Sequence, residues 1–225
     1  MRPFDGAVFD LDGTLVDNMG VHARAFGAFV ERHGLPPFDE TMRARLDGKR
    51  NRDIFPILFG RQMPMDEIHR LSEEKESLYR ELSKGRLAPL RGLTRLLSLL
   101  DARGIPVAIA TSSPAENVPH TLGEIGLRER FTHVARSDTV PRGKPHPDVF
   151  LAACRLIDRP ATRCVAFEDA PIGIIAARAA GMECVAVTTT FSPETFASHG
   201  APSSVAVADY EEYLEGAGRW LVEPS

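Results

Sequence analysis

The stretch Ala7-Val8-Phe9-Asp10-Leu11-Asp12-Gly13-Thr14-Leu15-Val16-Asp17 decides how the rest of this chain can fold. Its first three residues are apolar and are followed at once by polar ones, which predicts a short buried strand ending at Phe9. Two carboxylates follow, and Gly13 permits a sharp turn of the backbone. Ligands of open α/β sheets bind at the carboxyl ends of parallel strands, so Asp10 and Asp12 are placed where chemistry is expected.

The two carboxylates favour a metal-assisted site. Asp10 and Asp12 repel one another unless a cation or a proton relieves the repulsion. A carboxylate beside a metal ion can act as a nucleophile, while a second one acts as a general acid or base. The alternative is an ordinary turn, since Asp and Gly are common in turns for conformational reasons. The other polar groups along the chain have to decide between these two interpretations.

Length and composition limit the class of protein. The chain has 225 residues, enough for one large domain or for a core with a smaller inserted domain. With 43% hydrophobic residues and a formal net charge of −4, we expect a buried core and neither nucleic acid nor an anionic membrane as partner. The three cysteines have no metal-ligand spacing, and no apolar run resembles a signal peptide or a membrane span. We therefore expect a cytoplasmic protein, and a monomer.

The chain is predicted to consist of an α/β core interrupted by an all-helical insertion. After Asp17 the apolar residues change to helical spacing, and residues 18–87 are predicted to form a small helical bundle. Its helices are expected at 18–33, 41–46, 52–59 and 66–84. Helices and strands then alternate, which predicts a Rossmann-like parallel sheet with right-handed crossovers. The core domain is therefore expected over residues 1–17 and 88–225, and the inserted domain over residues 18–87.

Further polar groups lie at or near the ends of later predicted strands, at the same edge of the sheet. They are Thr111, Ser112, Lys144, Glu168 and Asp169. Carboxylates suit Mg²⁺, hydroxyl and backbone donors suit a phosphate oxygen, and a lysine supplies a compact positive charge. Each group alone has a simpler explanation as a helix cap or a solvated loop. Together with Asp10 and Asp12 they indicate phosphoryl transfer.

The order of these motifs resembles that of the haloacid dehalogenase-like hydrolases. The four matching segments are Asp10-Leu-Asp12-Gly-Thr, Val107-Ala-Ile-Ala-Thr111-Ser-Ser, Lys144-Pro-His-Pro-Asp148 and Phe167-Glu168-Asp169-Ala-Pro-Ile-Gly173. The insertion is similar to the small helical cap of the subfamily that includes β-phosphoglucomutase and the phosphoglycolate phosphatases. The resemblance therefore implies an α/β core with a cap domain, and catalytic roles for Thr111 and Lys144.

The resemblance also implies a mechanism. Asp10 would be the nucleophile that forms an aspartyl phosphate, and Asp12 would be the general acid and base. Mg²⁺ would be bound by Asp10, by the backbone carbonyl of Asp12 and by Asp169, with Glu168 beside it. Dehalogenating members lack an acid at the position of Asp12, so its presence here favours phosphate esters.

Substrate binding is expected from two motif residues and four cap residues, namely Thr14, Ser112, His22, Arg50, Arg52 and Lys75. His22 resembles a histidine of the mutase, but its helical spacing with two phenylalanines also fits a packed core residue. Lys75 falls on an apolar stripe, from which it could extend to solvent or meet the substrate. The arginine of the mutase cap is replaced by Asn51, which lies between Arg50 and Arg52.

The sequence thus predicts a Mg²⁺-dependent phosphatase of small phosphorylated metabolites, with sugar phosphates favoured. One alternative is a phosphomutase similar to β-phosphoglucomutase. An alternative of another class is a phospho-receiver signalling domain, against which the helical insertion and the close Asp-x-Asp spacing argue.

Overall fold

The computed structural model describes residues 3–46, 48–201 and 203–223, and a six-stranded sheet forms the centre of this part of the chain. Neighbouring strands are parallel, in the order β3-β2-β1-β4-β5-β6. The strands are β1 (Gly6–Phe9), β2 (Val107–Thr111), β3 (Val134–Arg136), β4 (Cys164–Glu168), β5 (Glu183–Val187) and β6 (Val205–Val207). The predicted Rossmann-like parallel sheet is confirmed, and its first strand lies between β2 and β4.

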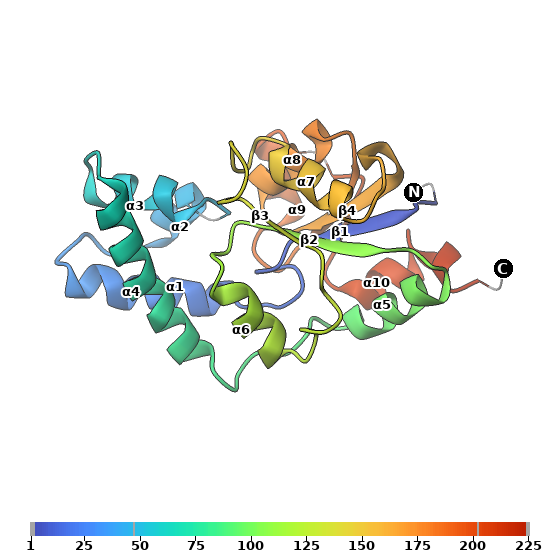
Figure 1. The fold of residues 1–225 in the computed structure, drawn as a ribbon, viewed down its shortest axis with the longest axis horizontal. Helices are drawn as coiled ribbons and strands as arrows, with labels where there is room; N and C mark the ends of the chain where they lie inside the picture. The colour runs from blue at the N-terminus through green and yellow to red at the C-terminus, as the bar shows by residue number, and fades with distance from the viewer. Residues whose placement is uncertain (1–2, 47, 202, 224–225) are drawn as a thin grey trace.

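Helices cover both faces of this sheet (Figure 1). One face packs against α7 (Asp148–Leu156), α8 (Pro171–Ala179) and α9 (Pro193–Ser198), and the other against α5 (Leu93–Ala102), α6 (Asn117–Glu124) and α10 (Tyr210–Glu215). Successive strand residues alternate between the faces. Val8 therefore belongs to the apolar cluster on the side of α7, α8 and α9, and Phe9 to the cluster on the side of α5, α6 and α10. The ring of Phe9 stacks on that of Phe167 with centroids 4.7 Å apart. Burial on both faces explains why the strands carry apolar residues toward both sides of the sheet.

Four further helices lie beyond the sheet, at the left of Figure 1. They are α1 (Met19–Arg32), α2 (Glu40–Leu46), α3 (Asn51–Phe59) and α4 (Met65–Ser83). Their apolar faces meet in a third cluster, in which the fully buried Phe29 packs edge-on against Phe55. This grouping agrees with the predicted bundle. The domain limits stay a prediction, and residues 1–2, 47, 202 and 224–225 of the predicted domains lie outside the described residues.

A row of polar side chains joins α4 to α6. The paired residues lie at i, i+3, i+4 and i+7 on α4 and at i, i+3 and i+4 on α6, which places one row opposite the other. The pairs are Glu76 with Asn117 (2.6 Å), Tyr79 with Thr121 (3.0 Å), Arg80 with Asn117 (2.9 Å) and Ser83 with His120 (2.8 Å). The helical insertion is thus held to the sheet domain by hydrogen bonds as well as by the chain itself.

The four helices predicted for the insertion and the first strand agree with the structure within one residue at each end. In the rest of the chain, α9 and α10 lie where the sequence predicts no helix. Both have only six residues, too few to show a helical period. Both carry a side-chain cap instead, since Ser192 accepts a hydrogen bond from the amide of Thr195 and Asp209 from that of Glu212. No helix in the described part of the chain is long and apolar enough to cross a lipid bilayer.

Candidate active site

The carboxyl ends of the central strands bring the main polar groups together. Asp10 directly follows β1, and its amide continues the strand by donating to the carbonyl of Phe167 at 2.9 Å. Thr111 is the last residue of β2, and Asp169 follows the last residue of β4. Because β1 lies between β2 and β4, these groups share one edge of the sheet.

The turn after β1 is shaped around Gly13. Its φ of 79° is in the left-handed region, and a Cβ at this position would collide with the carboxyl group of Asp169. The amide of Gly13 donates to the side chain of Asn18 at 3.0 Å, and Asn18 in turn donates to Asp12 at 2.6 Å. Glycine thus allows the loop carrying Asp12 to close on the carboxylate that follows β4.

Lys144 reaches the same edge from the loop that precedes α7. Its ammonium nitrogen lies 2.5 Å from Asp10 Oδ1 and 2.6 Å from Glu168 Oε1, and all three side chains are buried. Burial and the charge of Glu168 raise the pKa of Asp10 to about 8 despite the opposing charge of Lys144. Burial opposes the charged form of Lys144, but the two carboxylates outweigh it and raise the pKa of the lysine. Both shifts indicate that negative charge predominates in the cluster.

The excess of negative charge fits a divalent cation. Asp10, Glu168 and Asp169 each offer a carboxylate oxygen, and these oxygens lie within 4.8 Å of one another. Burial and the charges of Glu168 and Asp10 also raise the pKa of Asp169. One lysine cannot balance three buried carboxylates, whereas hard oxygen ligands are those that Mg²⁺ prefers. The carboxylate of Asp12 is not part of this group, so its ligation through the backbone carbonyl stays a prediction.

Asp12 has a different environment from Asp10. Its carboxylate accepts hydrogen bonds from Ser113 and Asn18, and His22 Nε2 lies 3.5 Å from Oδ1. Burial opposes ionisation, but the hydrogen bonds and the charge of His22 outweigh it and lower the pKa of Asp12 to about 2. Two carboxyl groups with opposite pKa shifts therefore lie on one loop.

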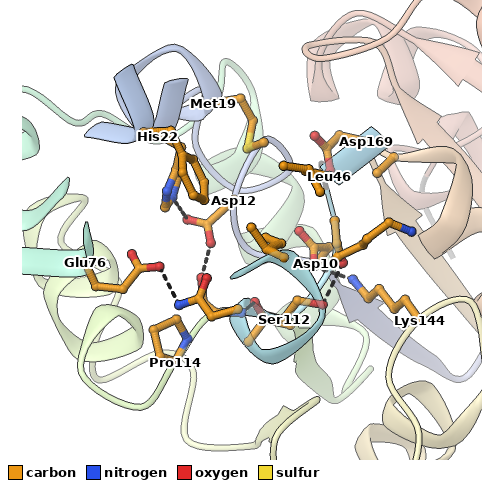
Figure 2. A pocket seen from close by; sticks show the side chains of 18 of the residues that line it. Asp10, Asp12, Met19, His22, Leu46, Glu76, Ser112, Pro114, Lys144 and Asp169 are labelled. Carbon is orange, nitrogen blue, oxygen red and sulfur yellow. Dashed lines mark hydrogen bonds and ion pairs between the residues drawn. The ribbon is translucent and has the colours of Figure 1, made fainter. Parts of the chain in front are cut away.

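A pocket lies between the strand ends and the helices α1–α4. Figure 2 shows Asp10, Lys144 and Asp169 on one side, His22 and Glu76 on the other, and Asp12 between them. Of the predicted site residues, those that line the pocket are Asp10, Asp12, His22, Lys75, Thr111, Ser112, Lys144, Glu168 and Asp169. His22 and Lys75 are joined by a hydrogen bond of 2.9 Å.

Three predicted substrate-binding residues do not line the pocket. Thr14 is fully buried beneath it, with its hydroxyl 3.5 Å from Asp169 and its carbonyl bonded to Tyr210. Arg50 precedes α3, and its guanidinium group turns to the carboxylate of Asp53 at 2.7 Å. Arg52 lies on the exposed side of α3. A helix turns about 100° per residue, so neighbouring residues point in quite different directions.

Several lining residues are not among the site residues predicted from the sequence. They include Lys49, Asn51, Glu76 and Ser113. The hydroxyl of Ser113 donates a hydrogen bond to Asp12, whereas the neighbouring Ser112 is the residue expected to bind substrate. The hydroxyl of Ser112 donates to the carbonyl of Gly48 at 2.9 Å. Ser113 could have been found, since it is the last residue of the second motif. The sequence pattern does not mark Glu76 as a pocket residue, because a charged residue on a helix is ordinarily solvated.

Comparisons with known proteins agree with this geometry. A family model described as a haloacid dehalogenase-like hydrolase matches residues 4–181. Hexitol phosphatase A of Escherichia coli is 35% identical over 187 residues, which cover 81% of this chain and 82% of that protein. The β-phosphoglucomutase of Bacillus subtilis is 33% identical over 189 residues, covering 80% of this chain and 81% of the mutase.

A longer relative and a solved structure complete the comparison. This chain spans half (50%) of the chloroplastic 5-amino-6-(5-phospho-D-ribitylamino)uracil phosphatase of Arabidopsis thaliana, to which it is 30% identical over 186 residues. The crystal structure of a HAD hydrolase of family IA, variant 3, from Entamoeba histolytica superposes with a TM-score of 0.85 at 25% identity. That match covers 97% of this chain and 100% of the other.

Proposed function

We propose, from the premise that this chain belongs to the haloacid dehalogenase-like hydrolases, that it is a Mg²⁺-dependent phosphatase of small phosphorylated metabolites, with sugar phosphates preferred. The observation that carries the proposal is the pair of carboxyl groups on the loop after β1. Asp10 is placed beside Lys144, while Asp12 is hydrogen-bonded separately. Relatives named as phosphatases of phosphorylated small molecules support the substrate class.

In the first step, an oxygen of Asp10 attacks the phosphorus atom of the substrate, and the bond to the ester oxygen breaks. Asp12 gives its proton to that leaving oxygen, so the products are an alcohol and an aspartyl phosphate. Asp12 has to be protonated for this step. The arrival of the anionic phosphate group next to it favours the protonated form, because like charges raise the pKa of a carboxyl group.

In the second step, water attacks the phosphorus atom and Asp12 takes up the proton, which regenerates Asp10 and releases phosphate. Lys144 and the donors of Thr111 and Ser112 surround the transferring group, where they stabilise its charge. Mg²⁺ held by Asp10, Asp169 and Glu168 would supply further positive charge at the phosphate oxygens. The residues that line the pocket opposite Asp10 orient the rest of the substrate.

A panel of phosphorylated metabolites assayed for phosphate release with Mg²⁺ tests this function. We expect repeated turnover on one or more sugar or polyol monophosphates, and none in the Asp10→Asn variant. Failure to release phosphate from any member of the panel, or from a chromogenic phosphomonoester, would contradict the proposal.

A second candidate is a phosphomutase, favoured by the similarity to β-phosphoglucomutase and by the presence of His22 and Lys75 in the pocket. The neutral Asn51 at the position of the mutase arginine argues for hydrolysis. Incubation with β-glucose 1-phosphate, Mg²⁺ and a trace of the bisphosphate separates the two. Rapid formation of glucose 6-phosphate with little free phosphate would favour the mutase.

The receiver-domain alternative is wrong, because the family match identifies an enzyme. We further propose a cytoplasmic location, which the free state of Cys154, Cys164 and Cys184 supports. The monomeric state stays a prediction.

A further inference from the structure

The cap side of the pocket contains a buried carboxylate that the mechanism does not use. Glu76 lines the pocket from α4, opposite Asp10 and Lys144 (Figure 2), and is only 3% exposed. Its Oε1 accepts hydrogen bonds from Asn51 at 2.8 Å and from Lys75 at 3.0 Å, and its Oε2 accepts one from Asn117 at 2.6 Å. A buried negative charge therefore faces the part of the substrate that is not transferred.

The position of this carboxylate is fixed from three elements. Asn51 is the first residue of α3, Asn117 is the first residue of α6, and Lys75 precedes Glu76 on α4. Arg80 donates to Asn117 Oδ1 at 2.9 Å, which turns the amide nitrogen of Asn117 toward Glu76. Glu76 thus has no free rotation by which it could leave the pocket wall.

Glu76 also remains ionised. Burial opposes the charge, but the charges of Lys75 and His22 and the hydrogen bonds from Asn51 and Lys75 outweigh it, and the pKa of Glu76 lies below its ordinary value. The charge therefore persists at neutral pH.

The ammonium group of Lys75, which adjoins Glu76, already has interaction partners within the protein. The ammonium group of Lys75 contacts Glu76, lies 2.9 Å from His22 Nδ1 and sits 4.2 Å from the centroid of the Phe26 ring. Lys49 also lines the pocket, and its backbone amide donates to the carbonyl of Leu46 at 3.1 Å. It follows Gly48, whose carbonyl is bonded to Ser112 beside the transferred group. The lysine that adjoins Glu76 is thus already engaged and is not free to bind a second anion.

We propose that Glu76 makes the cap side of the pocket a site for neutral hydroxyl groups and excludes a second phosphate, so that the substrate is a sugar or polyol carrying one phosphate. The inference rests on the proposed function, since the transferred phosphate occupies the side of Asp10. Each carboxylate oxygen can accept two hydrogen bonds, and Oε2 has one donor among the described residues. A substrate hydroxyl can supply the second, whereas a phosphate dianion would be repelled.

Matched substrates that differ by one phosphate group test the inference. The pairs are fructose 1-phosphate with fructose 1,6-bisphosphate, and glucose 6-phosphate with glucose 1,6-bisphosphate. Because like charges in a partly dehydrated site repel strongly, we expect kcat/KM to be higher for the monophosphate by about tenfold or more. In Glu76→Gln the ratio should fall to about threefold or less, through a lower KM for the bisphosphate.

Glu81→Gln is the matched control, since Glu81 is an exposed residue of the same helix and the change of charge is the same. This control should keep the wild-type ratio. Equal or better hydrolysis of the bisphosphates by the wild-type protein would overturn the inference, even if Glu76→Gln does not fold. An unchanged ratio in a folded Glu76→Gln protein would overturn it as well. If no phosphomonoester is hydrolysed at all, the proposed function fails and this inference fails with it.

Discussion

Replacement of Lys144 by methionine would remove the ammonium group that contacts both Asp10 and Glu168. The two contacts, at 2.5 and 2.6 Å, hold this charge within the buried cluster, next to the position of the transferred phosphoryl group. At an effective dielectric constant of about 20, two unit charges about 4 Å apart attract by roughly 4 kcal/mol. Loss of one donor to a developing negative charge typically reduces kcat by about 10² to 10³.

We therefore expect kcat/KM of Lys144→Met to fall by about 100- to 1,000-fold, mainly through kcat. The assay is continuous phosphate release at saturating Mg²⁺, with the best monophosphate of the panel. Lys84→Met, a change at an exposed lysine, is the control and should keep wild-type kinetics. Thermal unfolding followed by circular dichroism checks the fold, because loss of one partner of a buried ion pair costs about 3–5 kcal/mol. A folded variant with kcat/KM within about threefold of wild type would refute the reasoning.

Asp10→Asn should lose turnover while keeping its thermal unfolding transition, since an amide is a poor nucleophile; substantial phosphate release by this folded variant would refute the assignment. Removal of metal with EDTA should stop phosphate release and added Mg²⁺ should restore it, so activity that survives exhaustive chelation would contradict the metal site. Lys75→Ala should raise KM for sugar phosphates more than it lowers kcat, because Lys75 lines the pocket outside the carboxylate cluster; a fall confined to kcat would argue against this. Phe29→Ala should lower the free energy of unfolding in urea by about 3–5 kcal/mol, since the ring is fully buried, and a loss below about 1 kcal/mol would refute the packing described.

The carboxylate cluster could be predicted because the geometry of a parallel sheet is restrictive. Lys144 is 134 residues from Asp10 in the sequence, yet both belong to the edge where the strands end. A strand that ends in a polar residue is recognisable from its apolar run alone. The proximity of Asp10, Lys144 and Asp169 therefore follows from the order of the elements, whereas the roles proposed for them come from the resemblance to the family.

The cap side could not be predicted in the same way. The sequence favours Arg50 and Arg52 as pocket residues, yet α3 begins at Asn51 and turns that residue toward Glu76. A shift of one residue in the start of a helix rotates every side chain by about 100°, and the sequence leaves such a shift open. The positions of Glu76 and Asn117 in the site depend on partners in other helices, and a local sequence pattern does not reveal those partners.

The polar row between α4 and α6 bears on how this protein could be recombined with its relatives. A chimera that exchanged only residues 18–87 would set a foreign helix against Asn117, His120 and Thr121. The buried amide of Asn117 and hydroxyl of Thr121 would then lose their acceptors and donors, and each unpaired buried polar group costs about 1–3 kcal/mol. A graft that also carried residues 117–124 would transfer every donor together with its acceptor. The piece that can be moved between family members is therefore discontinuous in sequence, and a crossover placed at the ends of the insertion would cut through it.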